Sequence, residues 1–274
     1  MRTVLVTGAS TGIGRACALH CAQRGWQVFA GVRSAAHGDA LRAMSAAITP
    51  LLLDVTVAEQ VAAAAQTLAA SAGSGLHGLV NNAGIAVAGP LEFLPLAALR
   101  QQLEVNVVGQ LAVTQALLPL LRSARGRIVN ISSVSGRVAA PLLGAYAASK
   151  FALEALSDVL RSELRPWGMH VCSVQPGPID TPIWAKSRLA AETLRAGLPA
   201  RADSLYGAAM KAAALHEAGL QPVMLPPERV ALAVWHALTA RWPRVRYPIG
   251  MPGYSAEFVA RFAPDRLRNW LVQL

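Results

Sequence analysis

A tyrosine and a lysine, Tyr146 and Lys150, are four residues apart in a segment with helical periodicity. Side chains at this spacing project from one face of a helix, so we expect the phenol and the amine to lie together. A free phenol, with a pKa of about 10, is a poor base at neutral pH, but a neighbouring ammonium favours its ionised form. The pair is therefore predicted to exchange a proton with a substrate oxygen. The alternative is a packed aromatic ring beside a solvated lysine.

A glycine-rich segment follows the first predicted strand, 3–7, and opens a helix over about 13–24. Glycine permits a sharp turn, close approach of a pyrophosphate to the main chain, and tight packing of helix on strand. Free N–H groups and the helix dipole then attract the anion. We predict a dinucleotide site here; the alternative is an ordinary strand-to-helix turn, and ATP is disfavoured because the lysine of a triphosphate loop is absent. The cofactor-binding residues predicted in this loop are Gly8, Ser10, Thr11, Gly12, Ile13 and Gly14.

The second predicted strand, 27–32, ends in Arg33 and Ser34 rather than in an acidic residue. An acidic residue at this point binds the ribose hydroxyls of NAD, whereas a basic residue accommodates the 2′-phosphate of NADP. We therefore predict that NADP(H) is preferred and that NAD(H) is possible. The alternative is that Arg33 is an ordinary surface residue.

Ser133 follows a predicted strand, 127–132, and precedes Tyr146 by thirteen residues. This strand ends at the sheet edge where doubly wound folds bind ligands. The Ser133 hydroxyl is predicted to hold the substrate oxygen beside the phenol and to stabilise developing negative charge. The adjacent Ser132 is the alternative.

Several motifs occur together in one order: Thr7-Gly8-x-x-x-Gly12-Ile13-Gly14, Asn81-Asn82-Ala83-Gly84, Asn106, Ser133 and Tyr146-x-x-x-Lys150. In order and spacing they resemble the short-chain dehydrogenase/reductase family, and the resemblance extends over residues 3–250. It implies an NAD(P)-dependent enzyme that interconverts a carbonyl and a secondary alcohol. It also implies that Asn106 anchors a water relay to Lys150, although an asparagine within a helix is often incidental.

The same resemblance implies further contacts with the cofactor. Asp54, with Val55 beside it, is expected at the adenine, although Asp54 as a helix cap before Thr56 is the alternative. Tyr146 and Lys150 are expected at the nicotinamide end, with Lys150 on the ribose. Residues expected at the adenosine ribose and the central sheet are Asn81, Ala83 and Gly84. Residues expected at the nicotinamide carboxamide are Pro176, Gly177, Ile179 and Thr181.

Short aliphatic runs alternate with longer alanine- and leucine-rich segments along the chain. Further strands are predicted over 49–53, 78–81, 169–174 and 245–249, and further helices over 58–70, 97–122, 145–165 and, as the last helix, 227–240. Strands that are apolar along their whole length indicate a sheet buried on both faces. The prediction is an α/β fold, a doubly wound Rossmann-type three-layer sandwich with a parallel, seven-stranded sheet, forming one domain over residues 1–274.

Composition narrows the class of protein. The chain has 274 residues, 54% of them hydrophobic, and a net charge of +10 with no block of basic residues, so we expect a globular protein that binds no nucleic acid. Cys17, Cys21 and Cys172 suit a reducing compartment, and the pair beside His20 lacks a fourth ligand, so no metal site is expected. We expect a cytoplasmic homodimer or homotetramer with no integral membrane segment.

The substrate side is predicted to be apolar. A lid region over about 178–226 and a C-terminal extension over about 251–274 are expected to cover the site. The substrate residues predicted are Ser133, Val138, Leu143, Tyr146 and Trp184. Other candidates for the lining are Leu205, Tyr206, Met210, Met224, Trp242, Tyr247, Met251 and Tyr254, with core packing or an oligomer interface as the alternative.

Two further segments, 162–168 and 246–250, resemble the steroid and retinol dehydrogenase branch of the family. A lipophilic ketone or alcohol is therefore the expected small-molecule substrate. A different hypothesis is a dinucleotide sensor or structural protein without turnover, whose mark would be loss of Tyr146 or Lys150. A methyltransferase would not need both residues, and a nucleotide-sugar epimerase usually carries a larger C-terminal domain.

Overall fold

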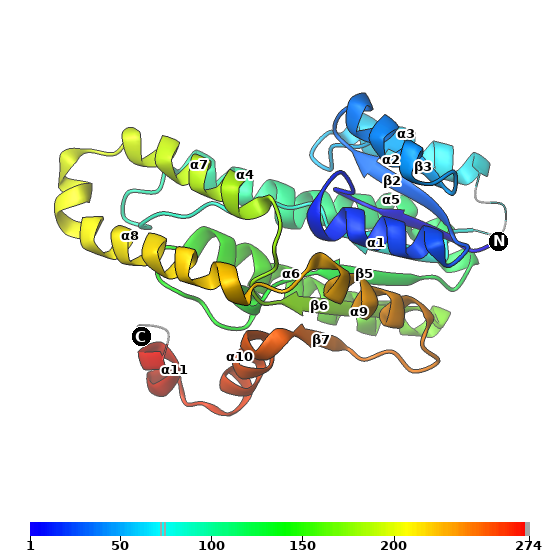
Figure 1. Ribbon diagram of the computed structural model, residues 1–274. Coiled ribbons are helices and arrows are strands. Elements are labelled where there is room, and N and C mark those ends of the chain that lie inside the picture. Colours follow the sequence, from blue (N-terminus) through cyan, green and yellow to red (C-terminus); the bar gives the residue numbers. More distant parts are fainter. Residues whose placement is uncertain (72, 74, 272–274) are drawn as a thin grey trace.

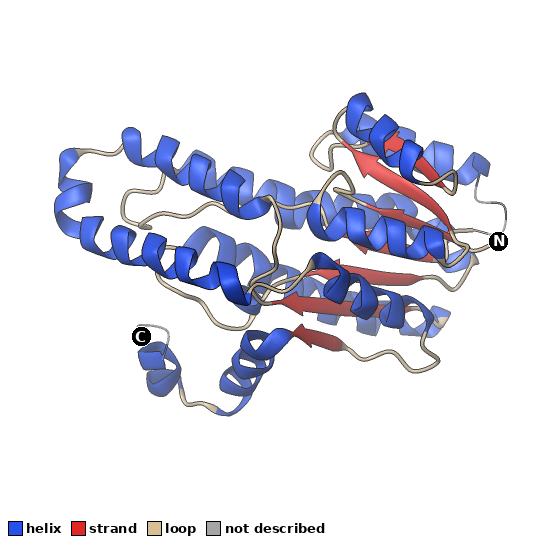
Figure 2. Ribbon diagram, in the orientation of Figure 1, coloured by secondary structure: helices blue, strands red, loops and turns tan. Residues whose placement is uncertain are grey.

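Seven parallel strands form a single twisted sheet, as predicted (Figures 1 and 2). Their order across the sheet is β3-β2-β1-β4-β5-β6-β7. The computed structural model describes residues 1–71, 73 and 75–271. The strands are β1 (Thr3–Val6), β2 (Gln27–Val32), β3 (Ile48–Leu52), β4 (Gly78–Asn81), β5 (Arg127–Ile131), β6 (His170–Pro176) and β7 (Arg246–Ile249).

Helices cover both faces of the sheet and explain why the strands are apolar throughout (Figure 2). Successive side chains of a strand point to opposite faces. Val4 and Val6 pack into a core with α1, α2 and α9, whereas Leu5 packs on the other face with α3, α5 and α6. The helices of the first face are α1 (Gly12–Gln23), α2 (Ala35–Met44) and α9 (Pro227–Thr239). Those of the second face are α3 (Ala58–Ser71), α5 (Gly109–Ser123) and α6 (Gly144–Leu164).

The long helix predicted over 97–122 is interrupted. It consists of α4 (Leu96–Leu103), a π-helical turn (Glu104–Val108) and α5. By length and mean hydropathy, Leu96–Ser123 is the one span among the described residues that could cross a membrane, and 33% of its most apolar window is buried. In this fold α5 packs against α3 and β4, which gives its apolar residues a place in the core. The π turn contains Asn106, and such turns frequently occur at functional sites.

Two helices stand beyond the sheet in the predicted lid region. α7 (Ile183–Ala196) follows Pro182 and α8 (Ala200–Leu220) follows Pro199, so the prolines separate the helices rather than break them. Figure 1 shows the two helices as a hairpin that projects away from the sheet. α8 has a single buried residue, Ala202. The hairpin therefore contributes little to the core.

Outside the lid region, three helices were not predicted. α2 is short, and its only buried residues are Gly38 and Leu41, so it has no clear apolar stripe. The helix α9 was expected to be the last, but α10 (Gly250–Phe262) and α11 (Asp265–Leu271) follow it. Gly250, Pro252 and Gly253 stand in the first turn of α10, where proline is tolerated although it is typical of loops.

Candidate active site

A cavity of about 1480 Å³ opens at the carboxyl edge of the sheet. It is lined by the segments that follow β1 to β5 and by the end of β6, which is where doubly wound sheets bind ligands. The structure brings most of the predicted residues to it: Gly8, Ser10, Thr11, Gly12, Ile13, Arg33, Ser34, Asp54, Val55, Ala83, Gly84, Ser133, Val138, Leu143, Tyr146, Lys150, Pro176, Gly177, Ile179, Thr181 and Trp184. Three of the predicted catalytic and cofactor-binding residues lie outside its lining: Gly14, Asn81 and Asn106.

The glycine loop is a tightly packed turn between β1 and α1. Gly8 and Gly12 have φ values of +62° and +54°, which side chains rarely permit. A Cβ atom on Gly14 would lie 2.3 Å from the Gly8 carbonyl oxygen, so this glycine lets α1 approach the loop. Asn82, directly after β4, supports the loop, because its Nδ2 donates to the carbonyl oxygens of Thr7 (2.9 Å) and Gly8 (3.1 Å).

The predicted adenosine end of the cavity holds Arg33, Ser34 and Asp54. Arg33 is exposed and lines the cavity at the end of β2. Ser34 caps α2, since its Oγ accepts from the His37 backbone N–H at 3.4 Å. The Asp54 Oδ1 accepts from the backbone N–H and the hydroxyl of Thr56 (3.0 and 2.7 Å). These are the local hydrogen bonds expected if Asp54 is a cap before Thr56, which was the alternative to an adenine contact. Its place in the cavity leaves the predicted adenine contact open to test.

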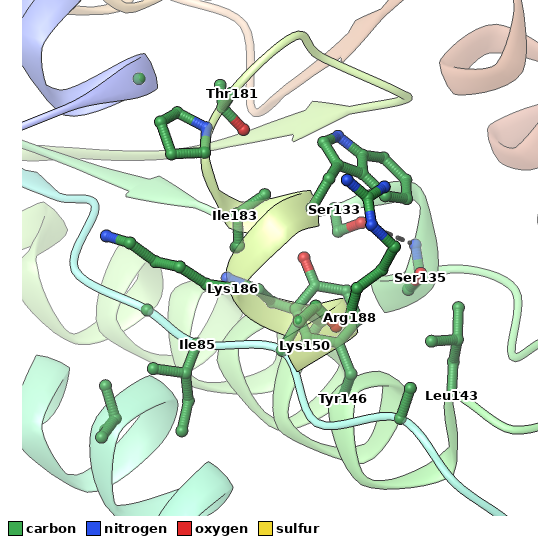
Figure 3. A pocket seen from close by; sticks show the side chains of 18 of the residues that line it. Ile85, Ser133, Ser135, Leu143, Tyr146, Lys150, Thr181, Ile183, Lys186 and Arg188 are labelled. Carbon is green, nitrogen blue, oxygen red and sulfur yellow. Dashed lines mark hydrogen bonds between the residues drawn. The ribbon is translucent and has the colours of Figure 1, made fainter. Parts of the chain in front are cut away.

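Ser133, Tyr146 and Lys150 meet on one side of the cavity (Figure 3). Both members of the helical pair come from α6, and Ser133 follows β5. The Lys150 ammonium lies 5.7 Å from the centroid of the Tyr146 ring and donates to the Ile131 carbonyl oxygen at 2.8 Å. The Ser133 Oγ accepts from the Ser135 backbone N–H at 3.1 Å, and Ser133 and Tyr146 both line the cavity.

The direction of the tyrosine pKa shift corrects the prediction from spacing. Burial raises the pKa of Tyr146, although the hydrogen bond with Ser133 lowers it. The predicted lowering by Lys150 does not decide the sign, because burial is the largest influence on the pKa of Tyr146. Burial also lowers the pKa of Lys150, to about 8, with Glu154 opposing that shift. The phenol is therefore protonated at neutral pH, the form that donates a proton.

Asn106 fixes the wall of the cavity rather than lining it. Its Oδ1 accepts from the Ile85 backbone N–H at 2.9 Å, and its Nδ2 donates to the Ile85 carbonyl oxygen at 3.0 Å and to the Ser149 Oγ at 3.1 Å. Ser149 in turn donates to the Tyr146 carbonyl oxygen at 2.7 Å. The π turn thus connects the segment after β4 with α6.

Gln102, one turn before Asn106, was not among the predicted site residues. It is fully buried; its Oε1 accepts from the Val87 backbone N–H at 2.7 Å and its Nε2 donates to the Ile85 carbonyl oxygen at 2.8 Å. Its spacing was the available signal, because a polar side chain four positions before Asn106 lies on the same helix face. Both side chains hold the same cavity wall.

Asn81 lies beneath the cavity in the central sheet. Its Nδ2 donates to Thr114 Oγ1 on α5 and to Asn130 Oδ1 on β5, both at 2.9 Å. The side chain is 2% exposed. The structure therefore agrees with the predicted support of the sheet and places Asn81 outside the lining expected for a ribose contact.

A buried carboxylate on α6 was also missed. Glu154, one turn after Lys150, accepts hydrogen bonds from Arg246 Nε (2.9 Å), Gln175 Nε2 (3.0 Å) and Ser173 Oγ (3.2 Å). Arg246 also reaches Asp158 at 2.6 Å. The partners are distant in sequence, so spacing along the chain gave no signal.

The family model for short chain dehydrogenases matches residues 2–192. The chain belongs to the short-chain dehydrogenase family. "Retinol dehydrogenase 5" of Mus musculus is 40% identical over 276 residues, covering 96% of this chain and 85% of that protein. "NADPH-dependent 3-dehydrocapnine reductase" of Ornithobacterium rhinotracheale is 35% identical over 274 residues, covering 97% and 94%. A short chain dehydrogenase from Burkholderia cenocepacia J2315, solved in complex with NADP, matches with a TM-score of 0.74 at 28% identity and covers 100% of both chains.

In this dehydrogenase, α7 supplies one wall of the substrate side. Trp184 lines the cavity, and its Nε1 donates to the Ile179 carbonyl oxygen at 2.8 Å. Figure 3 shows Ile183, Lys186 and Arg188 on the same helix, above Tyr146 and Lys150. Met210 of α8 lines the cavity as predicted.

Several other residues predicted to line the cavity lie outside it. Tyr247 is a core residue whose hydroxyl lies 2.9 Å from the His236 Nδ1. The C-terminal extension reaches the cavity through Pro252 and Ala256 of α10 instead, because the opposite side of that helix faces solvent. Predicted residues outside the lining are Leu205, Tyr206, Met224, Trp242, Tyr247, Met251 and Tyr254.

The three cysteines are free thiols in the core, at positions 17, 21 and 172. Burial raises the pKa of each thiol. None of them lines the large cavity. They therefore act as small apolar side chains in this structure.

Proposed function

We propose that this dehydrogenase interconverts a carbonyl and a secondary alcohol with NADP(H), and that Tyr146 is its general acid and base. One observation carries the proposal: Ser133, Tyr146 and Lys150 line the same cavity as the glycine loop and Arg33. A phenol and a hydroxyl converging beside a dinucleotide loop have few other uses.

The residues present fit a dinucleotide. Gly8 and Gly12 open their main chain to the cavity, and the first turn of α1 lies behind them. Arg33 provides a cation where a 2′-phosphate would lie, which supports NADP(H). The nicotinamide ring supplies or accepts the hydride when it is bound. Asp54, Val55, Ala83 and Gly84 are proposed for the adenosine half, and Pro176, Gly177, Ile179 and Thr181 for the carboxamide.

In the direction of carbonyl reduction, the Ser133 hydroxyl holds the substrate oxygen and the Tyr146 phenol donates a proton to it. The raised pKa of Tyr146 keeps that proton in place at neutral pH. As the proton leaves, the Lys150 ammonium stabilises the phenolate that forms. Alcohol oxidation uses the same groups in reverse, with the phenolate as base.

The wall of the cavity supports a proposal for the substrate class. Val138, Leu143, Trp184 and Met210 present apolar surface to the same cavity as Ser133 and Tyr146. One relative of 40% identity is called retinol dehydrogenase, and another, 35% identical, is called 17-beta-hydroxysteroid dehydrogenase. We therefore propose a lipophilic ketone or alcohol as substrate. A cytoplasmic homodimer or homotetramer stays a prediction from the sequence.

The test is a panel of steroid-like, retinoid-like and small hydrophilic carbonyl compounds, followed by NADPH absorbance. We expect turnover of lipophilic members and a loss of at least about a hundredfold in Tyr146→Phe, since general acid catalysis contributes typically 10²–10⁴-fold. Tyr254→Phe on the exposed side of α10 is the matched control and should keep full activity. Unchanged turnover in Tyr146→Phe, with NADPH binding intact, would remove the proposed acid.

A further inference from the structure

A second cavity lies at the opposite edge of the sheet from the candidate active site. Its volume is about 160 Å³, enough for roughly five water molecules at about 30 Å³ each. It is lined by residues at the amino ends of strands and at the ends of two helices: Arg2, Trp26, His77, Ala124, Arg125, Arg127, Leu238 and Thr239. We call it the basal cavity.

Cationic and neutral donors dominate this lining. Three arginines contribute, and no aspartate or glutamate is among the lining residues. Within residues 1–71, 73 and 75–271, no ion pair involves Arg2, Arg125 or Arg127. Arg2 lies over the Trp26 ring at 5.7 Å from its centroid, and Arg127 donates to the Ala237 carbonyl oxygen at 2.9 Å. Three arginines thus line the basal cavity, and no carboxylate does.

His77 adds a neutral donor. The Thr3 backbone N–H donates to the His77 Nδ1 at 3.2 Å, so that nitrogen carries no proton and Nε2 does. Burial lowers the pKa of His77, and the positive charge of Arg2 lowers it further. Burial, with a contribution from Arg2, also lowers the pKa of Arg127. The charge of Arg2 thus opposes positive charge on His77 and on Arg127, and a negative charge beside these groups would relieve that repulsion.

We propose that the basal cavity binds a small multivalent oxyanion, phosphate or sulfate, either free or as the end group of a small ester. Guanidinium groups match such oxyanions in charge and in geometry, because they offer paired N–H donors. The buried ring of Trp26 and the side chain of Leu238 close its apolar floor, which limits the size of the ligand. A bound oxyanion would connect the starts of β1, β4 and β5.

The experiment titrates inorganic phosphate into the full chain by calorimetry and by thermal unfolding, against chloride at equal ionic strength. A ligand that binds only the folded chain raises Tm in a saturable way. We expect saturable binding of phosphate and none of chloride. A parallel titration with glycerol 3-phosphate distinguishes a free oxyanion from the end group of an ester. Affinity for glycerol 3-phosphate equal to that for phosphate assigns an ester as the ligand, and weaker affinity assigns the free ion.

Variants locate the site. Arg125→Gln and Arg2→Gln change exposed side chains and should each weaken phosphate binding at least tenfold. Arg33→Gln tests the proposed cofactor site, and Arg261→Gln removes an exposed charge on α10; both should leave this binding unchanged. Equal stabilisation by chloride, or full affinity in both Arg125→Gln and Arg2→Gln, would overturn the proposal. Loss of binding in Arg33→Gln alone would assign the anion to the cofactor site instead.

Discussion

Glu154 offers a sharp test of how the fold supports the catalytic lysine. Its side chain is 5% exposed and lies one turn after Lys150 on α6. Replacing Glu154 with Gln keeps the shape of the side chain but removes its negative charge. The Arg246 guanidinium then loses one of two carboxylate partners, and Lys150 loses the one charge that raises its pKa.

The stability cost can be worked from the contacts. Removing one partner of a buried ion pair costs about 3–5 kcal/mol. The Arg246 side chain is 24% exposed and keeps Asp158 at 2.6 Å, so we expect a smaller loss of about 2–3 kcal/mol. At about 2–4 °C per kcal/mol, Tm should fall by roughly 4–12 °C.

The same change should alter the pH dependence. The Lys150 ammonium is present below its pKa of about 8 and is lost as the pH rises through that value. Because Glu154 raises this pKa, its neutral replacement lowers it. The alkaline limb of kcat/KM for NADPH, which reports the free enzyme, should therefore move to lower pH.

The assay combines urea unfolding with a pH profile from neutral to alkaline conditions. Glu163→Gln, an exposed position on the same helix, is the matched control and should change neither quantity. An unfolding free energy within about 0.5 kcal/mol of the parent, the range of ordinary surface substitutions, together with an unmoved alkaline limb would refute the reasoning.

Three further changes test the cofactor side and the sheet. Arg33→Ala should lower the ratio of kcat/KM for NADPH to that for NADH by about tenfold or more, since a hydrogen bond to a charged group contributes about 1.5–3 kcal/mol; an unchanged ratio contradicts the phosphate contact. Gly14→Ala places a Cβ 2.3 Å from a backbone oxygen and should abolish NADPH binding in a fluorescence titration, whereas Gly207→Ala, with nothing within 4 Å, should not. Asn81→Leu leaves Thr114 Oγ1 and Asn130 Oδ1 buried without this hydrogen-bond partner. It should lower the free energy of unfolding in urea by about 1–3 kcal/mol; wild-type stability would show that the amide does not support the sheet.

Much of the fold could be predicted because the strands are buried on both faces. Val4, Leu5 and Val6 serve two different cores, so the run is apolar without alternation. Parallel strands also place the segments after them at one edge, and the motifs that follow β1, β4 and β5 meet there. Order along the chain was therefore enough to place the glycine loop near Tyr146.

The rest depends on contacts that local sequence does not encode. Spacing brought Tyr146 and Lys150 together, but the sign of the pKa shift is set by burial, which sequence alone does not give. Arg246 reaches Glu154 across 92 positions of the chain, so their pairing follows from the sheet order. Asn106 turns toward Ile85 because a π turn interrupts its helix.

The central claim is that a hydride passes between the dinucleotide and a carbonyl carbon while Tyr146 supplies the proton. NADPH deuterated at the transferable position of the nicotinamide ring tests it in a single turnover with an active ketone from the panel, read by mass spectrometry of the alcohol. The account predicts one deuterium on the carbinol carbon with the parent enzyme and, over the same time, no measurable alcohol with Tyr146→Phe. Alcohol without deuterium, or alcohol formed equally fast by Tyr146→Phe, would contradict it.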